Sequence, residues 1–175
     1  AGVMQEMGYK VGGFRATISS SVLRGSGLSS SAAFEVLIAA ILDGLYNGFI
    51  VDAKTRAVIA QKVENVYFGK PCGLMDQTAC AVGGFITIDF KDPTNPVIEK
   101  LDFDLTGAGF ALCIVNTGGN HADLTNEYAL VPKEMKEVAA FFGKEFLRDV
   151  DEQEFYDKIG EVRKEAGDRA VLRAM

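Results

Sequence analysis

A run of glycines and serines carries the clearest chemical signal in this sequence. It reads Gly25-Ser26-Gly27-Leu28-Ser29-Ser30-Ser31 and lies between a predicted strand and an apolar helix. Glycine lets a backbone approach an anion closely, and the free amides at a helix N-terminus favour phosphate. The run lacks the lysine of a Walker A loop and the third glycine of a dinucleotide fingerprint. It therefore predicts another kind of phosphate-binding loop, with a glycine-rich turn before an ordinary serine-capped helix as the alternative.

Two carboxylates further along the chain occupy positions where a charge is costly. Asp76 is flanked by Leu74, Met75 and Ala79, and such surroundings favour a carboxylate that is held by a cation or tuned to accept a proton. Glu64 lies beside the apolar stripe of a predicted helix, where it could bind an ATP-bound Mg²⁺ together with a loop serine. The alternatives are a helix N-cap for Asp76 and a salt bridge or a solvated position for Glu64.

Two ring side chains follow a second apolar run. His121 and Tyr128 flank the end of the loop that begins at Asn116, where an imidazole and a phenol could reach a polar ligand. A single histidine in a loop is more often exposed or hydrogen bonded, so this signal is weak by itself.

The periodicity predicts the elements that must position these groups. The first predicted elements are a strand, Phe14–Val22, and a buried central helix from Ala32 to Leu42. A second helix has Asp52 as its N-cap and ends before Gly69, and a short helix closes at Gly83-Gly84. A hairpin of Phe85–Phe90 with Val97–Phe103 follows. In the second helix, Ile59, Val63 and Val66 form the predicted inward stripe.

The rest of the chain reads as one strand and then helices. Phe110–Val115 predicts a fully buried strand. A helical pattern begins near Leu124, is interrupted by Pro132 and stops at Gly143. It resumes after Asp151, whose Glu154 three residues on suggests a capping box.

Composition narrows the range of partners. The chain has 175 residues, 48% of them hydrophobic, with a formal net charge of −6 and a sequence pI of about 4.9. These values argue against a nucleic-acid binder or a polybasic membrane anchor. No apolar run reaches the length of a membrane span, and Ala1–Lys10 has no secretory pattern, so a cytoplasmic protein is expected.

Three cysteines, Cys72, Cys80 and Cys113, show no zinc-like spacing. A disulfide framework is not expected from this odd set. We expect reduced thiols, with Cys80 and Cys113 behaving as small buried hydrophobes.

From Phe14 to at least Val150 the chain resembles galactokinases of the GHMP kinase superfamily. Two motifs carry this resemblance, the glycine and serine loop from Gly25 to Ala33 and the more specific segment Gly69-Lys70-Pro71-Cys72-Gly73-Leu74-Met75-Asp76-Gln77. Asn116-Thr117, His121 and Glu127-Tyr128 also look like the galactokinase pattern around the sugar. The family's loop usually follows a proline, whereas Leu23-Arg24 precedes it here.

The resemblance implies a role for each matching residue. Gly25 to Ser31 would bind the phosphates of ATP, while Ser31 and Glu64 would hold Mg²⁺. Asp76 would be the base, and Gly73 and Tyr128 would contact the sugar. The family's transition-state arginine and its C-terminal glycine-rich motif have no counterpart here, and both ends look cut, so a partial chain is expected.

The resemblance also implies a fold and a reaction. The fold class is α+β, with residues 1–97 as part of a nucleotide-binding domain like ribosomal protein S5 domain 2 and residues 98–175 as the start of a ferredoxin-like domain. The reaction would be phosphorylation of α-D-galactose at its C1 hydroxyl. The alternatives are a kinase for a related sugar such as N-acetylgalactosamine and a galactose- and ATP-binding sensor without turnover.

Overall fold

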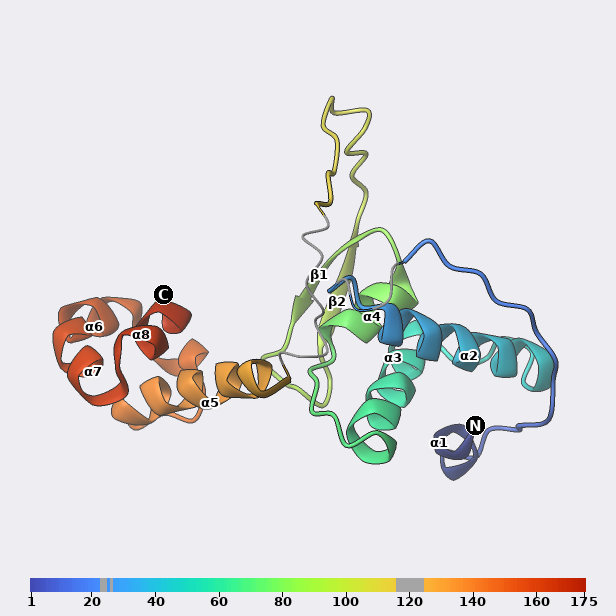
Figure 1. Cartoon of the computed structure of the whole chain (residues 1–175), viewed down its shortest axis with the longest axis horizontal. Coiled ribbons are helices and arrows are strands. Elements are labelled where there is room, and N and C mark those ends of the chain that lie inside the picture. Colours follow the sequence, from blue (N-terminus) through green and yellow to red (C-terminus); the bar gives the residue numbers. More distant parts are fainter. Residues whose placement is uncertain (23–24, 26, 116–124) are drawn as a thin grey trace. The chain divides into compact units, whose positions relative to one another are not determined.

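The computed structural model describes residues 1–22, 25, 27–115 and 125–175, and the chain divides into two compact units. The first unit comprises residues 1–120 and the second residues 121–175. The elements of both are labelled in Figure 1. The predicted domain boundary between residues 97 and 98 stays a prediction.

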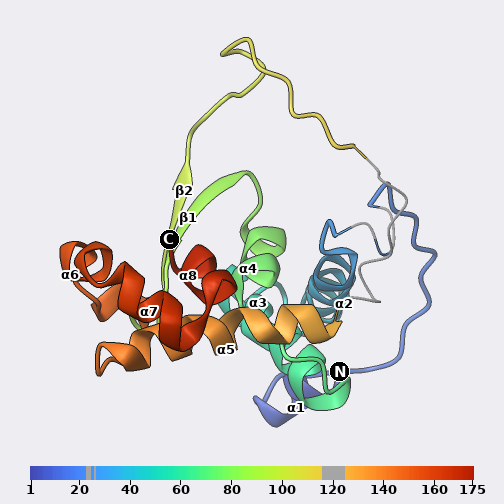
Figure 2. The same ribbon diagram turned by 60° about the vertical axis from the view of Figure 1, so that its left-hand side comes forward.

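The described part of the first unit contains helices, one hairpin and long irregular segments. Its elements are α1 (Gly2–Glu6), α2 (Ser30–Tyr46), α3 (Ala53–Lys62), the π-helix η1 (Val63–Tyr67), α4 (Met75–Val82), β1 (Phe85–Asp89) and β2 (Val97–Leu101). Helices α2, α3 and α4 contact one another and lie side by side (Figure 2). Residues of α1, α2, α3 and the loop before α3 form a core of Val3, Met4, Ala39, Leu42, Val51 and Ile59. Helix α4 is held beside this core by its contacts with α2 and α3.

A fully buried carboxylate joins α2 to the loop before α3. Asp43 has no exposed side-chain surface, and its two oxygens accept hydrogen bonds from the Val51 amide at 3.2 and 3.3 Å. The Arg56 guanidinium lies 3.7 Å away and balances the charge. Asp52 then caps α3 by accepting from the Thr55 amide at 2.7 Å, as the sequence predicts.

The hairpin after α4 confirms the strand and turn predictions with slightly shorter strands. β1 and β2 pair antiparallel from Phe85 opposite Leu101 to Asp89 opposite Val97. Asp92 closes the turn by accepting from the Thr94 amide at 2.9 Å. Gly83, at φ 70°, ends α4 and leads into the hairpin, which a residue with a Cβ would do only under strain.

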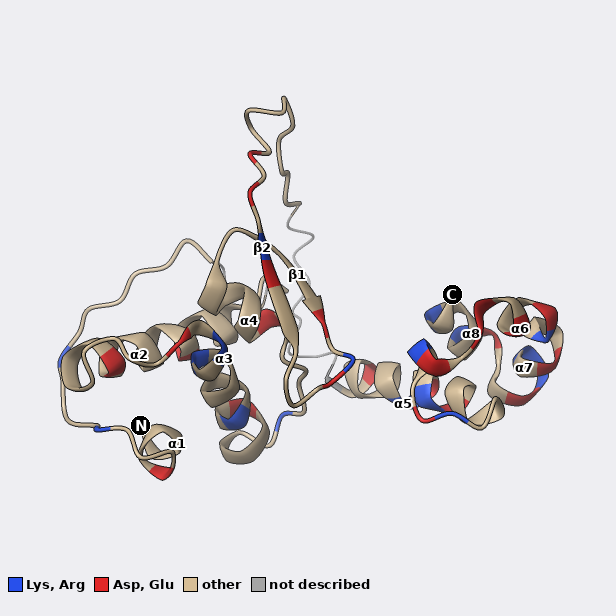
Figure 3. Cartoon of the chain, turned by 180° about the vertical axis from the view of Figure 1, so that it is seen from behind, with Lys and Arg blue, Asp and Glu red and all other residues tan. Residues whose placement is uncertain are grey.

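The second unit is helical throughout its described part. It contains α5 (Thr125–Phe141), the 3₁₀-helix η3 (Leu147–Asp149), α6 (Glu152–Asp157), α7 (Ile159–Ala166) and α8 (Asp168–Ala174), around a core of Val138, Phe155, Val162, Ala170 and Val171. Lys, Arg, Asp and Glu residues are frequent along α6, α7 and α8 (Figure 3). Glu134, which is buried, accepts from Arg169 at 2.9 Å and Arg173 at 2.6 Å, and these bonds lower the pKa of Glu134.

Helix α5 passes through Pro132, so the predicted interruption there is wrong. Glu134, Val138 and Ala139, which follow the proline, are buried, and their packing outweighs one missing hydrogen bond. Half of the predicted capping box at α6 is confirmed, because Asp151 accepts from the Glu154 amide at 2.9 Å. The Glu154 carboxylate instead pairs with Lys158 at 2.7 Å.

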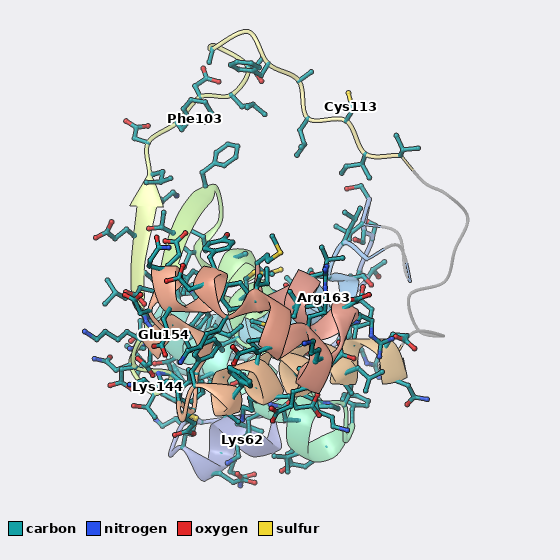
Figure 4. All side chains as sticks on the ribbon, turned by 90° about the vertical axis from the view of Figure 1, so that its left-hand side faces the viewer. Lys62, Phe103, Cys113, Lys144, Glu154 and Arg163 are labelled. Atoms are coloured by element: carbon teal, nitrogen blue, oxygen red, sulfur yellow. The ribbon has the colours of Figure 1, made fainter. Side chains whose placement is uncertain are left out.

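Two predicted strands, Phe14–Val22 and Phe110–Val115, are not strands in this structure. Both segments are irregular, and Leu112 and Val115 are 76% and 81% exposed. A strand forms only by pairing with another, and within the described residues only β1 and β2 pair. Figure 4 shows Phe103 and Cys113 on the long segment after β2, where both side chains are exposed.

Three burial predictions are also wrong. Cys80, on α4, is exposed like Cys113 on the segment after β2. Helix α2 buries one face only, and Phe34 on its other side is 52% exposed. Val66 is 65% exposed and lies in the π-helix η1, so it does not join the predicted inward stripe.

The longest helices, α2 and α5, have 17 residues each. Within the described ranges, no helix combines the length and the apolar character that crossing a bilayer requires.

Replacing Asp43 with alanine should lower the free energy of unfolding by about 2–4 kcal/mol. The substitution leaves the Val51 amide buried without its acceptor and the Arg56 charge without its partner. Urea unfolding measures the effect, with Asp52→Ala as the matched control that removes only an exposed cap worth about 1 kcal/mol. Equal losses in the two variants would contradict this role for Asp43.

Candidate functional site

The structure brings the glycine and serine loop into contact with the Asp76 segment. The Ser29 hydroxyl donates a hydrogen bond to Asp76 Oδ2 at 2.6 Å, across 47 positions in the sequence. This distance is typical of a hydroxyl bound to a carboxylate. The two motifs that carry the strongest chemical signals in the sequence therefore form one site.

The loop turns by left-handed backbone conformations. Gly25 and Gly27 have φ of 72° and 77°, and Ser29 has φ of 56°. Ser26 lies outside the described residues. The conformation of Ser29 brings the chain directly into α2, which starts at Ser30.

The start of α2 provides unpaired backbone donors. Ser29 is its N-cap residue but makes no side-chain capping hydrogen bond, so the alternative of an ordinary serine-capped helix is wrong. The first amides of a helix have no partner within it, and its dipole is positive there. Ser30 is half-buried and Ser31 exposed at this end, while Leu28 is 39% exposed beside them. The arrangement can accept an anion such as a phosphate group.

Asp76 is the second residue of α4, whose N-cap position belongs to Leu74. The alternative of Asp76 as an N-cap is therefore wrong. Its neighbours Leu74 and Gln77 are buried, and Asp76 itself is half-buried. The carboxylate thus lies at the edge of the packed core, with Oδ2 held by Ser29 and within reach of a ligand.

A network of side chains from η1 and α3 fixes the loop that carries Gly73. Asn65 Oδ1 accepts from the Cys72 amide at 2.8 Å, and the Cys72 carbonyl accepts from Gln61 at 3.3 Å. Gly73 follows in an exposed position where an added Cβ would meet no atom within 4 Å. The protein itself therefore does not require glycine there, which fits a close approach by a ligand.

Glu64 is buried, as its position beside the apolar stripe suggested, and it belongs to a charged cluster. Lys70 Nζ lies 3.2 Å from Glu64 Oε2. The carboxyl group of Glu35, on α2, contacts Glu64, while Glu35 Oε2 is buried without a hydrogen-bond partner. Burial and then the Glu64 charge raise the pKa of Glu35 to about 8. The pair thus favours a protonated Glu35 at neutral pH.

Sequence reasoning missed Glu35, Asn65 and Lys70 as members of the site. A signal existed for Glu35, because it is the first carboxylate in an apolar helix and stands four residues after Ser31, on the same helical face. The role of Asn65 depends on the π-helical turn of η1, which the sequence does not reveal.

The oxygen donors on this face fit a magnesium nucleotide better than an all-protein metal cage. Ser31 and Glu64 are the predicted ligands, and Glu35 links them because it shares a face of α2 with Ser31 and contacts Glu64. Among the described residues, no group of three His, Cys, Asp or Glu side chains could hold a metal ion alone. Mg²⁺ commonly takes one or two protein oxygens and completes its shell with phosphate and water.

Two ring side chains that the sequence connects with the sugar, His121 and Tyr128, add no geometry to this site. His121 lies outside the described residues. Tyr128 is 51% exposed on α5, in the second compact unit, so its role as a sugar contact stays a prediction.

Comparison with known proteins agrees with the geometry. Residues 1–84 match the family of the GHMP kinases N terminal domain. The chain is 35% identical over 150 residues to a galactokinase of Streptomyces coelicolor, which covers 84% of this chain and 38% of that protein. A Pyrococcus furiosus galactokinase is 34% identical over 152 residues, covering 87% of this chain and 42% of its own length. A Mycobacterium tuberculosis galactokinase is 36% identical over 151 residues, which cover 83% of this chain and 40% of that protein. The chain thus spans about two fifths of the length of these relatives.

The Glu35–Glu64 pair should make the metal-free protein less stable as pH rises. Because the pKa of Glu35 is raised from its ordinary 4.5 to about 8, the folded state keeps a proton that the unfolded state has released. This contribution is complete below about pH 4.5 and is lost as pH rises towards 8. Glu35→Gln should flatten that part of the stability curve and gain about 1 kcal/mol at pH 8, a figure reduced for solvent screening.

Urea unfolding at several pH values, in buffer with a chelator, measures this effect. Glu99→Gln on the exposed side of β2 is the matched control, since it removes one carboxylate away from the pair. A parallel shift of both variants would show that Glu35 is ionised in the folded protein, contrary to the prediction.

Proposed function

We propose that the protein transfers the γ-phosphoryl group of ATP to the C1 hydroxyl of α-D-galactose, giving galactose 1-phosphate and ADP. The starting point is the match of residues 1–84 to the GHMP kinases N terminal domain. The observation that carries this proposal is the contact between Ser29 and Asp76. It places a carboxylate beside a loop suited to phosphate, which is the juxtaposition that phosphoryl transfer to a hydroxyl needs. The relatives' names supply the choice of galactose.

Each of the predicted site residues would have its own role in this reaction. The amides at the start of α2 and the serines of the loop would hold the nucleotide phosphates. Asp76 would accept the proton of the attacking hydroxyl at the carboxylate oxygen that Ser29 leaves free. Gly73 would let the sugar come close to the backbone, and Tyr128 would add a second sugar contact.

Ser31 and Glu64 would bind Mg²⁺, which neutralises phosphate charge when it is bound. Lys70 now balances the Glu64 charge at 3.2 Å. Glu35 would keep Glu64 oriented from the side of α2.

For the whole protein we propose the finer fold given above. Residues 1–97 would belong to a domain like ribosomal protein S5 domain 2, and residues 98–175 would begin a ferredoxin-like domain. The protein would work in the cytoplasm on ATP and a hexose, without nucleic-acid or membrane partners. A kinase for N-acetylgalactosamine or a non-catalytic galactose sensor remain the alternatives.

Replacing Asp76 with alanine should lower the galactose-dependent kcat by about 10²–10⁴-fold, because the base is lost. ATP binding should survive, since the phosphate contacts come from α2 and its loop. The measurement is ADP release by the full-length protein with ATP, Mg²⁺ and a panel of sugars. Asp102→Ala, an exposed aspartate on the segment after β2, is the matched control.

The outcomes separate the three candidate functions. Turnover with galactose that collapses only in Asp76→Ala supports the proposal. Faster turnover with N-acetylgalactosamine would change the substrate, and binding of galactose and ATP without ADP release would indicate the sensor.

A further inference from the structure

Ser29 adopts a backbone conformation that a serine takes only at a cost. Its φ and ψ are 56° and 40°, in the left-handed region, and among the described non-glycine residues only Phe49 shares a positive φ. Gly25 and Gly27 earlier in the loop meet the same requirement without a side chain. Glycine would also suit position 29, so the hydroxyl of Ser29 needs an explanation of its own.

That hydroxyl is not used where a serine at a helix start normally uses it. Ser29 is the N-cap residue of α2, yet it makes no capping hydrogen bond to the helix. It donates instead to Asp76 Oδ2 at 2.6 Å, in a half-buried position where water competes less. Ser29 therefore keeps a strained backbone conformation and leaves α2 without a side-chain cap, while its hydroxyl group connects the start of α2 to α4.

The contact limits the freedom of Asp76 in a defined way. An aspartate near the surface turns about two side-chain bonds, and a donor bound to one of its oxygens restricts both rotations. With Oδ2 bound to Ser29, Oδ1 is the oxygen left to receive a proton. Any movement of the phosphate-binding loop would therefore also move or release Asp76.

We propose that Ser29 is a positioning residue that orients Asp76 for proton acceptance and links the base to the conformation of the phosphate-binding loop. This inference rests on the proposed function and assigns Ser29 a task different from a phosphate contact. The serines at positions 30 and 31 and the backbone amides remain available for phosphate.

Two variants of the intact protein separate the hydroxyl from the backbone conformation. Ser29→Gly removes the hydroxyl and tolerates φ of 56°, whereas Ser29→Thr keeps a hydroxyl but fits that φ poorly. We expect Ser29→Gly to lower kcat for galactose-dependent ADP release by about 10–100-fold while the KM for ATP changes less than about threefold. Ser29→Thr should be the faster of the two.

A neighbouring hydroxyl and a double variant complete the test. Ser30→Ala removes a serine predicted to contact phosphate, so it should raise the KM for ATP more than Ser29→Gly does. In an Asp76→Asn background, adding Ser29→Gly should lower the remaining rate by less than about threefold, because Ser29 acts through Asp76. Thermal melts of every variant establish that each is folded.

Three results would overturn the inference. They are a raised KM for ATP with unchanged kcat in Ser29→Gly, a Ser29→Gly variant faster than Ser29→Thr, and an equal effect of Ser29→Gly with and without the Asp76 carboxylate. A wild-type protein that releases no ADP with any sugar would instead refute the proposed function itself.

Discussion

The buried face of α2 is the constraint on which the rest of the site depends. One face of this helix packs against both α3 and α4, and the two helices also contact each other. The helix is therefore held by two neighbouring helices, and Ala39 and Leu42 in its second half belong to the apolar core. Two polar contacts leave the same helix, from Ser29 to Asp76 on α4 and from Glu35 to Glu64 on η1.

Both contacts place charge at the edge of an apolar core, where it is stable only when it is paired. Asp43 shows how the fold satisfies such a group. Its two carboxylate oxygens accept hydrogen bonds from the Val51 amide, and the Arg56 guanidinium balances its charge. Glu64 is satisfied less fully, since Lys70 at 3.2 Å is half-exposed and Glu35 brings a second carboxyl group.

The sequence predicted the elements whose stability is local. Asp52 as the cap of α3, Gly83 as the end of α4 and the turn at Asp92 all depend on residues close to them in the chain, and all were found. The segments 14–22 and 110–115 have strand-like composition, but a strand depends on a partner that the described residues do not provide. The burial of Cys80 was mispredicted for a related reason, since an apolar neighbourhood in sequence does not reveal which face of α4 packs inward.

In the candidate site too, local features could be predicted from the sequence and contacts between distant segments could not. Its members could be named from residue types, because glycines and serines before a helix and an aspartate in an apolar segment are unusual without a task. Their partners could not, because the pairing of Ser29 with Asp76 depends on the packing of α2 against α4. The loop backbone shows the same difference between residues that serve the turn and residues that make a contact. Glycine occupies positions 25 and 27, where the turn alone requires a positive φ, whereas serine occupies position 29 despite a φ of 56°. A strained residue persists where the surrounding structure holds it, and Ser29 is held both by its hydrogen bond to Asp76 and by its place at the start of α2.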